Sequence, residues 1–398
     1  MSFKKFPART GQWIEVSTTG TKVLAYLPPK LPPEPPVDLR RLTFKLERAS
    51  HAIGRLDGLV DILPSTPVFL HAYIKQEAVL SSQIEGTQSS LSDLFFFEAE
   101  HMPDVTLDDI KEVSNYVDAL QHGISEIKRG IPLCQRLMRD MHTILLSSGR
   151  GSKKQPGEYR RSQNWIGGRY IEKAQYIPPP PTYIPDLMSD LEKFIHYESS
   201  EIPILVQAGL VHAQFECIHP FLDGNGRLGR LLITLLLCER GVLREPILYV
   251  SQFFNSHRPE YYEQLQQIHT HGDWESWFEF FLDGIFETSK RATKTAGNLL
   301  DLFERDQNQI KKLGRPALST LRVYHAFQEQ PILTVSFAAK STNLSPPTVR
   351  KAIQYLTYFG IVREVTGRTR NQIFVYDKFL NMLVQGTAED QSEAVDVL

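Results

Sequence analysis

The sequence predicts a mainly α-helical protein with one short β-hairpin, and two patterns lead to this prediction. Apolar residues recur at three- and four-residue steps along most of the chain, which is the spacing of amphipathic helices. The interval from Gly157 to Pro185 breaks this pattern, with Gly167-Gly168 followed by four prolines at 178–181, and predicts the hairpin and a stiff return. The periodic segments are 38–56, 110–127, 133–146, 185–197, 204–218, 228–240, 260–271 and 274–297.

Length and composition indicate an ordinary soluble globular protein. The chain has 398 residues, which at about 150 residues per domain suggests two or three domains. Hydrophobic residues make up 41% and charged residues 23%, so wholesale disorder is excluded. The formal net charge of −2 provides no overall attraction to nucleic acid or to an anionic membrane, and any such attraction must be local.

Cysteine usage and the apolar runs favour a cytoplasmic protein that does not enter a membrane. Cys134, Cys217 and Cys238 are too few and too scattered for a disulfide framework or a CxxC metal site. The N-terminal residues lack the apolar core of a signal peptide, and the longest apolar run, Leu231 to Cys238, is too short to span a bilayer.

Composition shifts divide the chain into five parts. Three proline doublets predict an extended tether in the first part. Residues 311–378 hold 11 Lys and Arg but only 3 Asp and Glu, which places a domain boundary near residue 311. The expected parts are an extended N-terminal segment (1–37), an N-terminal helical region (38–110), a helical core (111–310), a basic C-terminal domain (311–384) and an acidic tail that frays (385–398).

The most informative segment lies between two predicted helices and has the sequence HPFLDGNGRLGR, residues 219–230. Gly224-Asn225-Gly226 opens onto a helix N-terminus, where backbone N–H groups can converge on an anion without hindrance from a Cβ atom. Arg227 and Arg230 lie on one face of the first helical turn, where both guanidinium groups can reach further phosphate oxygens. The loop therefore predicts a site for a polyphosphate.

Two further residues of this loop suggest chemistry as well as binding. Asp223 is a hard oxygen ligand beside the predicted phosphates, where a magnesium ion would sit. His219 is the natural proton acceptor at neutral pH. A Gly-rich turn with a surface histidine would explain any one of these residues, but it does not explain all of them within twelve positions.

A rival hypothesis places a zinc or di-metal site in the same region, because four potential ligands fall on one helical face. However, Pro220 ends the helix after His219, and a metal hydrolase would leave residues 224–230 unexplained. The ligands of this rival site would be His212, Glu216, His219 and Asp223.

The loop resembles the Fic-domain signature, His-x-Phe-x-Asp/Glu-Gly-Asn-Gly-Arg-x-x-Arg, at every defining position, and the likeness covers about residues 40–295. The resemblance implies a Fic-type helical bundle with a β-hairpin flap. It also implies protein adenylyltransferase activity, or AMPylation: AMP passes from MgATP to a Ser, Thr or Tyr hydroxyl of a protein, and pyrophosphate is released.

The resemblance also assigns roles to single residues. Phe221 would be a structural anchor, and a glycine at 226 would favour transfer of AMP over transfer of the terminal phosphate. The implied assignments are His219 as general base, Asp223 as magnesium ligand, and Gly224, Asn225, Gly226, Arg227, Leu228, Gly229 and Arg230 as the ATP-binding loop, with the two arginines on the β- and γ-phosphates.

Upstream, residues 81–86 (SSQIEG) resemble the Fic inhibitory motif, Ser/Thr-x-x-x-Glu-Gly/Asn. In a helix Ser81 and Glu85 lie on one face, and Gly86 can end that helix. The resemblance implies that Glu85 pairs with Arg230 and displaces the γ-phosphate. The alternative is that both residues merely decorate a solvated helix face.

The same family likeness suggests a docking edge and an adenine pocket. The hairpin near 161–176 would be the flap that pairs with an extended target segment, a contact that makes little demand on target sequence. Residues 246–251 and the adjacent Tyr261 and Tyr262 would border the adenine. Because neighbouring residues on a helix point in different directions, at most one of these tyrosines should face the base.

The basic C-terminal segment resembles a winged helix-turn-helix. Residues 317–328, 336–342 and 345–358 are predicted helices, and residues 361–375 a two-stranded wing. The candidates for DNA contact are Thr348, Arg350 and Lys351 on the third helix and Arg368 and Arg370 in the wing. Such domains also serve as dimer or protein-docking modules, and a charge surplus can be a solvated face.

The sequence therefore predicts an ATP- and magnesium-dependent protein adenylyltransferase that Glu85 inhibits. Its partner would be a protein with a hydroxyl side chain; self-modification, a homodimer and DNA binding stay open. Two alternatives remain: a DNA-binding regulator whose Fic body only senses a nucleotide, and an enzyme that removes AMP, with Glu85 positioning water.

Overall fold

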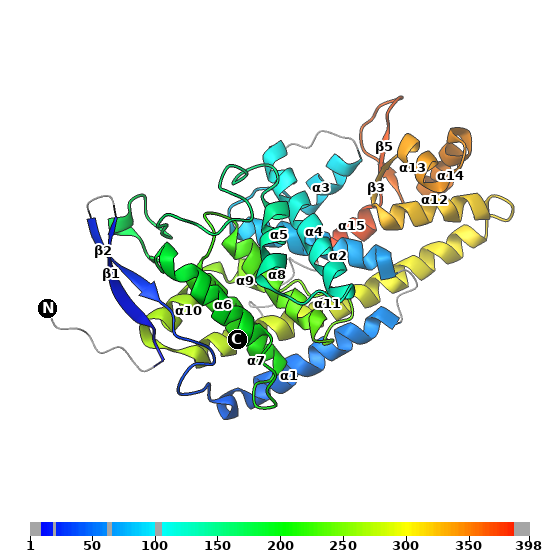
Figure 1. The fold of residues 1–398 in the computed structure, drawn as a ribbon. Helices are drawn as coiled ribbons and strands as arrows, with labels where there is room; N and C mark the ends of the chain where they lie inside the picture. Colours follow the sequence, from blue (N-terminus) through cyan, green and yellow to red (C-terminus); the bar gives the residue numbers. More distant parts are fainter. Residues whose placement is uncertain (1–8, 19–20, 62–65, 100–105, 386–398) are drawn as a thin grey trace, which may run out of the picture.

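The computed structural model describes residues 9–18, 21–61, 66–99 and 106–385, which form a mainly helical protein (Figure 1). None of the helices in these ranges is both long enough and apolar enough to cross a membrane. The larger part of the molecule contains α1 (Leu39–Gly58), α2 (Thr66–Ile84), α3 (Leu91–Glu98), α4 (Leu107–Lys128), α5 (Gln135–Leu145), α6 (Ile184–Ile195), α7 (Ile204–Ile218), α8 (Asn225–Glu239), α9 (Ser251–Ser256), α10 (Arg258–His271) and α11 (Trp274–Lys311).

Helices α7 and α8 lie side by side at the centre of this part. Nearly every residue of both is buried, because α4 and α5 pack against α8 while α6 and α11 pack against α7. The chain between them, residues 219–224, is the glycine-containing loop. The predicted segments 204–218 and 228–240 correspond to these helices, although α8 begins earlier, at Asn225.

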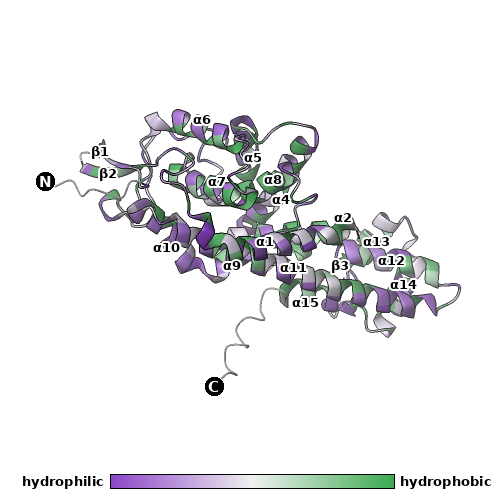
Figure 2. Ribbon diagram, turned by 90° about the horizontal axis from the view of Figure 1, so that it is seen from below, coloured by the Kyte–Doolittle hydropathy of each residue, from purple (hydrophilic) through white to green (hydrophobic). Residues whose placement is uncertain are grey.

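Helix α11 connects the two ends of the molecule. Its 38 residues correspond to about 57 Å at 1.5 Å per residue. Helix α1 runs beside its first half (Figure 1), with ion pairs Arg41–Glu279 at 2.6 Å and Lys45–Asp283 at 2.5 Å. Helix α10, which precedes α11 and exposes much of its surface, is predominantly hydrophilic (Figure 2). The prediction of a helix over 274–297 was too short, since α11 continues to Lys311.

Helix α2 extends from the C-terminal elements, at the far end of α11, to the loop between α7 and α8. Near its start, Phe69 is buried and packs edge-on against Phe303 of α11, with ring centroids 5.7 Å apart. Phe303 also contacts Tyr324, Tyr376 and Phe379 of the C-terminal elements. The other end of α2, at Ile84, reaches the first turn of α8.

The C-terminal elements lie at the end of α11 and include a small antiparallel sheet. The helices fall where the sequence predicts them, and residues 386–398 of the expected acidic tail lie outside the described residues. The elements are α12 (Ala317–Glu329), β3 (Ile332–Thr334), α13 (Val335–Thr342), α14 (Pro346–Tyr358), β4 (Arg363–Glu364), β5 (Ile373–Val375) and α15 (Asp377–Gln385).

The expected N-terminal tether is replaced in part by a β-hairpin that packs on the body. Strands β1 (Gln12–Thr18) and β2 (Thr21–Leu27) pair antiparallel, with Gln12 opposite Leu27. The prolines that predict an extended path begin only at Pro28, and the carbonyl of Pro29 accepts a hydrogen bond from Gln214 at 2.8 Å. The proline argument therefore applies to residues 28–36, whereas residues 12–27 carry β-branched and aromatic side chains that favour strands.

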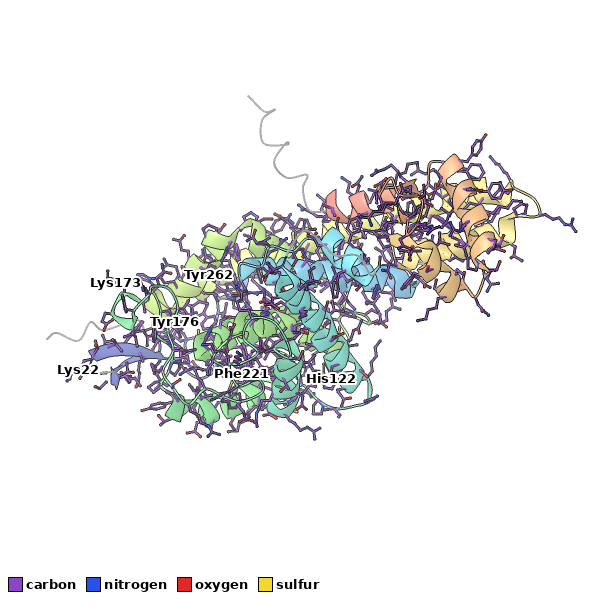
Figure 3. The ribbon with its side chains drawn as sticks, turned by 90° about the horizontal axis from the view of Figure 1, so that it is seen from above. Lys22, His122, Lys173, Tyr176, Phe221 and Tyr262 are labelled. Atoms are coloured by element: carbon purple, nitrogen blue, oxygen red, sulfur yellow. The ribbon has the colours of Figure 1, made fainter. Side chains whose placement is uncertain are left out.

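The predicted hairpin at 161–176 is reduced to a single β-bridge, between Ile166 and Tyr176. Gly167 and Gly168 both have positive φ and form turns, which the short 3-10 helix η2 (Ile171–Lys173) follows. Neighbouring residues pair with the N-terminal hairpin: the N–H of Tyr26 donates to the carbonyl of Ile177 at 2.8 Å. Figure 3 shows Lys22 and Lys173 at this junction, where Thr21 also donates to Glu172.

Candidate functional site

The loop between α7 and α8 is held by hydrogen bonds to its own backbone. His219 ends α7 in the left-handed conformation, with φ 48°, which is unfavourable for a residue other than glycine. Arg160 offsets this cost, since its Nε donates to the His219 carbonyl at 2.9 Å and its own N–H donates to the Pro220 carbonyl at 2.9 Å. Arg160 is buried, and sequence reasoning missed it because it lies 59 residues from His219.

Asn225 closes the loop with its side chain. Its Oδ1 accepts from the N–H of Phe221 and its Nδ2 donates to the Phe221 carbonyl, both at 2.9 Å. Phe221 is fully buried and stacks on His142 at 3.7 Å between ring centroids, which is the packing expected of an anchor. Figure 3 shows Phe221 inside the body. The Asn225 side chain thus shapes the loop, so Asn225 itself can offer an anion only its backbone N–H group.

Arg230 of α8 binds the end of α2, as the sequence predicts. Its Nε donates to Ser81 Oγ at 2.8 Å, and its Nη2 donates to the Ser81 carbonyl at 2.9 Å and to Glu85 Oε1 at 2.8 Å. The Arg230 side chain is 1% exposed and that of Glu85 is 32% exposed. Burial acts to raise the pKa of Glu85, but attraction to Arg230 outweighs it and holds the pKa below its ordinary value. Glu85 is therefore ionised at neutral pH.

Gly226 makes this ion pair sterically feasible. A Cβ atom at position 226 would lie 2.3 Å from Glu85 Oε1 and 3.1 Å from Arg230 Nη1. A larger residue would push the Glu85 carboxylate away from its place. The glycine that the family likeness connects with nucleotide orientation is thus also needed for Glu85 to approach α8.

Arg227 has an acidic partner that the sequence did not reveal. Its Nη1 donates to Glu112 Oε2 of α4 at 3.3 Å, and both side chains are 1% exposed. Glu112 Oε2 also accepts from Thr87 and from Arg150, each at 3.2 Å. Arg150 in turn donates to the backbone carbonyl of Glu85 at 3.2 Å. One feature of the sequence could have revealed Glu112: it lies on the apolar face of the predicted helix 110–127, where an unpaired acid is rare.

His219 is a neutral imidazole at pH 7. Burial and the nearby Arg160 lower its pKa to about 4, and its Nδ1 is a buried atom with no hydrogen-bond partner among the described residues. The nearest carboxyl oxygen, Glu216 Oε2, lies 4.0 Å away. Burial raises the pKa of Glu216 to about 8, so this side chain is protonated at neutral pH and forms no ion pair with His219.

Asp223 keeps one carboxylate oxygen available. Its Oδ1 accepts from the N–H of Gly224 at 2.7 Å and lies 3.6 Å from Arg227 Nη2. Its Oδ2 has no hydrogen bond to any residue that the structure describes, and the side chain is 33% exposed. A hard cation beside phosphates fits this arrangement, because magnesium is bound through one or two carboxylates together with substrate phosphates.

The rival metal site at the end of α7 is not formed. No group of three or more His, Cys, Asp or Glu side chains able to hold a metal occurs in the described part of the chain. His212 is fully occupied by hydrogen bonds, because Nδ1 donates to the Gly229 carbonyl and Nε2 accepts from Tyr261, both at 2.9 Å. It is a structural histidine of the core, and burial lowers its pKa to about 3.

Some of the residues predicted to border the nucleotide have their side chains in the core. Tyr261 is 1% exposed and is bonded to His212, so it offers no surface to a base, whereas Tyr262 is 42% exposed. The Leu228 side chain is fully buried, and a Cβ at Gly229 would lie 2.3 Å from Glu216 Oε1. Tyr262 remains the candidate for the adenine, while the side chains of Tyr261 and Leu228 lie in the core. The segment 247–250 is buried as well.

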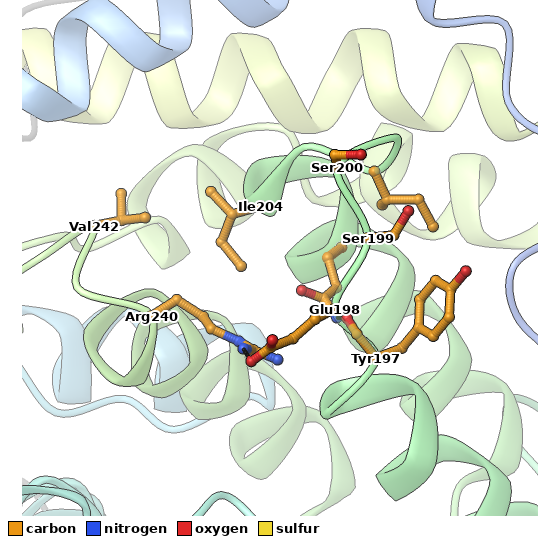
Figure 4. A pocket seen from close by; sticks show the side chains of 9 residues that line it. Tyr197, Glu198, Ser199, Ser200, Ile204, Arg240 and Val242 are labelled. Atoms are coloured by element: carbon orange, nitrogen blue, oxygen red, sulfur yellow. Dashed lines mark hydrogen bonds and ion pairs between the residues drawn. The ribbon is translucent and has the colours of Figure 1, made fainter.

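A separate pocket of about 490 Å³ lies at the other end of α7 and α8 (Figure 4). It is lined by the connection between α6 and α7, including Glu198, by Gln207 of α7 and by Arg240 after α8. Because α7 has 15 residues, this pocket is about 20 Å from the loop along the helix axis. It is therefore separate from the candidate site.

Two regions of the chain match known family domains. Residues 43–125 match the Fic/DOC family N-terminal domain, and residues 132–237 match the Fic/DOC family domain. The matched regions include Glu85 and Glu112 in the first domain and the complete loop in the second.

Curated relatives are named protein adenylyltransferases. A probable protein adenylyltransferase of Aquifex aeolicus is 39% identical over 88 residues, which are 22% of this chain and 26% of the relative. The protein adenylyltransferase Fic of Culex quinquefasciatus is 37% identical over 128 residues, 32% of this chain and 23% of the relative. The chain thus spans only about a quarter of the length of these relatives.

Solved structures share the fold. A Fic family protein from Desulfovibrio desulfuricans superimposes with a TM-score of 0.54 and 20% identity, over 84% of this chain and 95% of that one. A Fic domain containing signaling protein from Bacteroides thetaiotaomicron gives a TM-score of 0.51 at 20% identity, over 63% of this chain and 95% of that one.

Proposed function

We propose that this chain, which carries the N-terminal and central domains of the Fic/DOC family, is a protein adenylyltransferase that Glu85 holds in a restrained state. It transfers AMP from MgATP to a Ser, Thr or Tyr hydroxyl of a protein. The observation that carries the proposal is the Arg230–Glu85 ion pair at 2.8 Å inside an intact phosphate loop. A carboxylate occupies the guanidinium that a terminal phosphate would otherwise bind.

In the proposed reaction the target hydroxyl oxygen forms a bond to the α-phosphorus, and the bond from that phosphorus to the bridging oxygen of the β-phosphate breaks. Pyrophosphate leaves, and the hydroxyl proton passes to His219. The neutral imidazole supports this role, since its lowered pKa of about 4 keeps a lone pair free at pH 7. Arg160 positions the imidazole through the His219 backbone.

The remaining contribution of the loop is electrostatic. Phosphoryl-type transfer depends on alignment and charge neutralisation more than on covalent help from the protein. The N–H groups of the first α8 turn, Arg227 and Arg230 would hold the phosphates, and Asp223 would hold magnesium, which neutralises phosphate charge when bound. Both arginines are buried, so their attraction to an anion is weakly screened by solvent.

The site is restrained because carboxylates compete with the phosphates of ATP for the two arginines. Glu85 occupies Arg230, and Glu112 occupies Arg227, so an incoming triphosphate must replace at least the Glu85 carboxylate. ATP that binds without Arg230 would lie with its α-phosphate out of line for attack. A misplacement of about 1 Å can lower a rate about 100-fold.

The flap region offers a docking edge for the target. Trp165 and Tyr170 are 40% and 56% exposed there, beside the isolated bridge at Ile166. A target segment that pairs with this backbone would place its hydroxyl without strong sequence demand.

Labelled ATP tests the proposal. Incubation with ATP labelled at the α-phosphate should transfer label to the protein or to lysate proteins, whereas label at the γ-phosphate should not be transferred. His219→Ala should abolish labelling and leave ATP binding intact, and His196→Ala, at an exposed histidine of the surface, should label as wild type does. Transfer that survives His219→Ala would remove this residue as the base.

Removal of AMP by the same site is a second candidate. Arg230 binds only Glu85 Oε1, so Oε2 is left to hold a water molecule against an AMP-modified side chain. Release of free AMP from a modified target, lost in Glu85→Gly, would identify this direction.

A further inference from the structure

The C-terminal elements form a compact unit at the far end of α11, away from the phosphate loop. Figures 1 and 3 both show the unit, from α12 to β5, extending beyond the helical body. Its order is helix, strand, two helices and two strands, with a three-stranded sheet in the order β3-β5-β4. Helices α13 and α14 are joined by only three residues, 343–345, which is the length of a helix-turn-helix connection.

Helix α14 has one buried face and one polar face. Val349, Ala352, Ile353 and Leu356 are buried, because α12 and α13 pack against this side. Arg350, Lys351 and Gln354 are exposed on the opposite side. Arginine, lysine and glutamine are side chains that read base edges, and a single α-helix fits the major groove of B-DNA.

The loop between β4 and β5 adds two more cations. Arg368 and Arg370 are both exposed, and the turn that carries them is shaped by Gly367, with φ 62°. Glu364 Oε2 accepts from the N–H of Gly367 at 2.8 Å, so this acid is committed to holding the turn. The wing, the loop between β4 and β5, therefore presents two exposed arginines on a turn that is held in place.

The acids of this region do not neutralise these four cations. Residues 311–378 contain three acids, of which Asp377 pairs with Arg363 at 2.9 Å and Glu364 holds the turn. Among the residues that the structure describes, Arg350, Lys351, Arg368 and Arg370 make no ion pair within 4.0 Å. Isolated positive charge on an exposed helix and wing is complementary to a phosphate backbone.

We propose that this unit binds double-stranded DNA, with the exposed face of α14 in the major groove and the wing against the adjacent phosphates. Arg350 and Gln354 lie where base edges would be read, and Lys351, Arg368 and Arg370 would contact phosphates. The narrow major groove of an RNA duplex would not admit α14, so the fit is to DNA. The inference does not depend on the transferase activity, because none of these residues belongs to the phosphate loop.

Fluorescence anisotropy of a labelled 30-base-pair mixed-sequence duplex, titrated with the full chain and without ATP, tests the proposal. With three phosphate contacts, affinity should fall about 40-fold between 50 and 200 mM salt, since the logarithmic slope is about −0.9 per contact. An RNA duplex of the same sequence should bind at least about tenfold more weakly.

Two double variants test the two contact surfaces separately. Arg350→Ala/Lys351→Ala and Arg368→Ala/Arg370→Ala should each weaken DNA binding at least about tenfold, and the wing variant should reduce the salt slope by about 2. The matched control Arg55→Ala/Arg136→Ala removes two exposed arginines from α1 and α5 and should bind as wild type does.

Three outcomes would overturn the proposal: no duplex binding at 50 mM salt, equal binding of RNA and DNA, or unchanged binding by both double variants. Sedimentation tests a different occupant of the same surface. If the wild-type chain does not bind DNA but dimerises, and the two double variants do not dimerise, then the surface binds a second copy of the chain. Unchanged thermal unfolding of each variant ensures that lost binding does not reflect misfolding.

Discussion

Two groups of arginines in this molecule are in opposite surroundings. In the phosphate loop, Arg227 and Arg230 are each 1% exposed and each faces a carboxylate from outside the loop, Glu112 of α4 or Glu85 directly after α2. In the C-terminal unit, Arg350, Arg368 and Arg370 are exposed and have no acidic partner among the described residues. Both groups suit an anion, but by different physical routes.

The difference shows how burial changes the way an anion binds. A buried guanidinium needs a counter-charge at all times, because an uncompensated charge in the interior is costly. A phosphate therefore enters the loop by replacing a carboxylate, and the site can be restrained by that carboxylate. An exposed guanidinium is hydrated and screened by salt, so it needs no acidic partner before an anion binds. Each exposed guanidinium adds only a small increment to the affinity for the anion.

The largest expected effect comes from removing the competing carboxylate. Glu85→Gly frees Arg230, and AMP transfer should rise by about 100-fold in turnover, because the α-phosphate can then align. Labelling from α-labelled ATP under saturating MgATP and target measures this. Glu85→Gly/Arg230→Ala should lose most of the gain, and equal activity of wild type and Glu85→Gly would refute the inhibitory role.

Removing the second carboxylate should lower stability. Glu112→Gln removes the buried partner of Arg227 and leaves only the partly exposed Asp223, 3.6 Å away, so it should lower the free energy of unfolding by about 3 kcal/mol. The matched control on the same helix is Glu126→Gln, whose partner Arg129 is 70% exposed, and its effect should stay below about 1 kcal/mol. Chemical denaturation of both variants compares them, and equal effects would show that the Arg227–Glu112 pair contributes no more than a surface pair.

Glu216 should make the stability of the loop region depend on pH. Burial raises its pKa from 4.5 to about 8, so the folded state keeps a proton that the unfolded state releases above pH 4.5. Its contribution to stability is present below pH 4.5 and falls by about 1.4 kcal/mol per pH unit as the pH rises toward 8. Chemical denaturation between pH 4.5 and 8 measures this decline in the free energy of unfolding. The decline should be smaller in Glu216→Gln and unchanged in Glu201→Gln, at an exposed acid. If wild type and Glu216→Gln lose stability in parallel as the pH rises, Glu216 is not protonated in the folded state.

The smallest effect is expected at the exposed arginines. Arg368→Ala/Arg370→Ala should change the free energy of unfolding by less than about 0.5 kcal/mol, because neither side chain is buried or paired with a described acid. A loss of more than 1 kcal/mol in chemical denaturation would mean that the wing arginines are structural, and the contrast with the loop would disappear.

Local sequence determined the chemistry of the loop. The loop from 219 to 230 and the pair Ser81 and Glu85 could be recognised because the residues of each pattern lie close together in the sequence, within about twelve positions. Helix periodicity likewise located α7 and α8, since a buried helix must present apolar residues at regular steps. Even the Arg230–Glu85 pair, 145 residues apart, was expected only because both local patterns resemble those of one family.

Only the tertiary structure decided which partners complete the site. Glu112 reaches Arg227 across 115 residues, and Arg160 reaches His219 across 59, and neither contact leaves a local pattern in the sequence. The two adjacent tyrosines are another case that the sequence does not decide. They have the same intrinsic propensities, but Tyr261 lies in the core and Tyr262 is exposed. Burial and long-range pairing depend on how α4, α8 and α10 pack together, and that packing is a property of the whole chain.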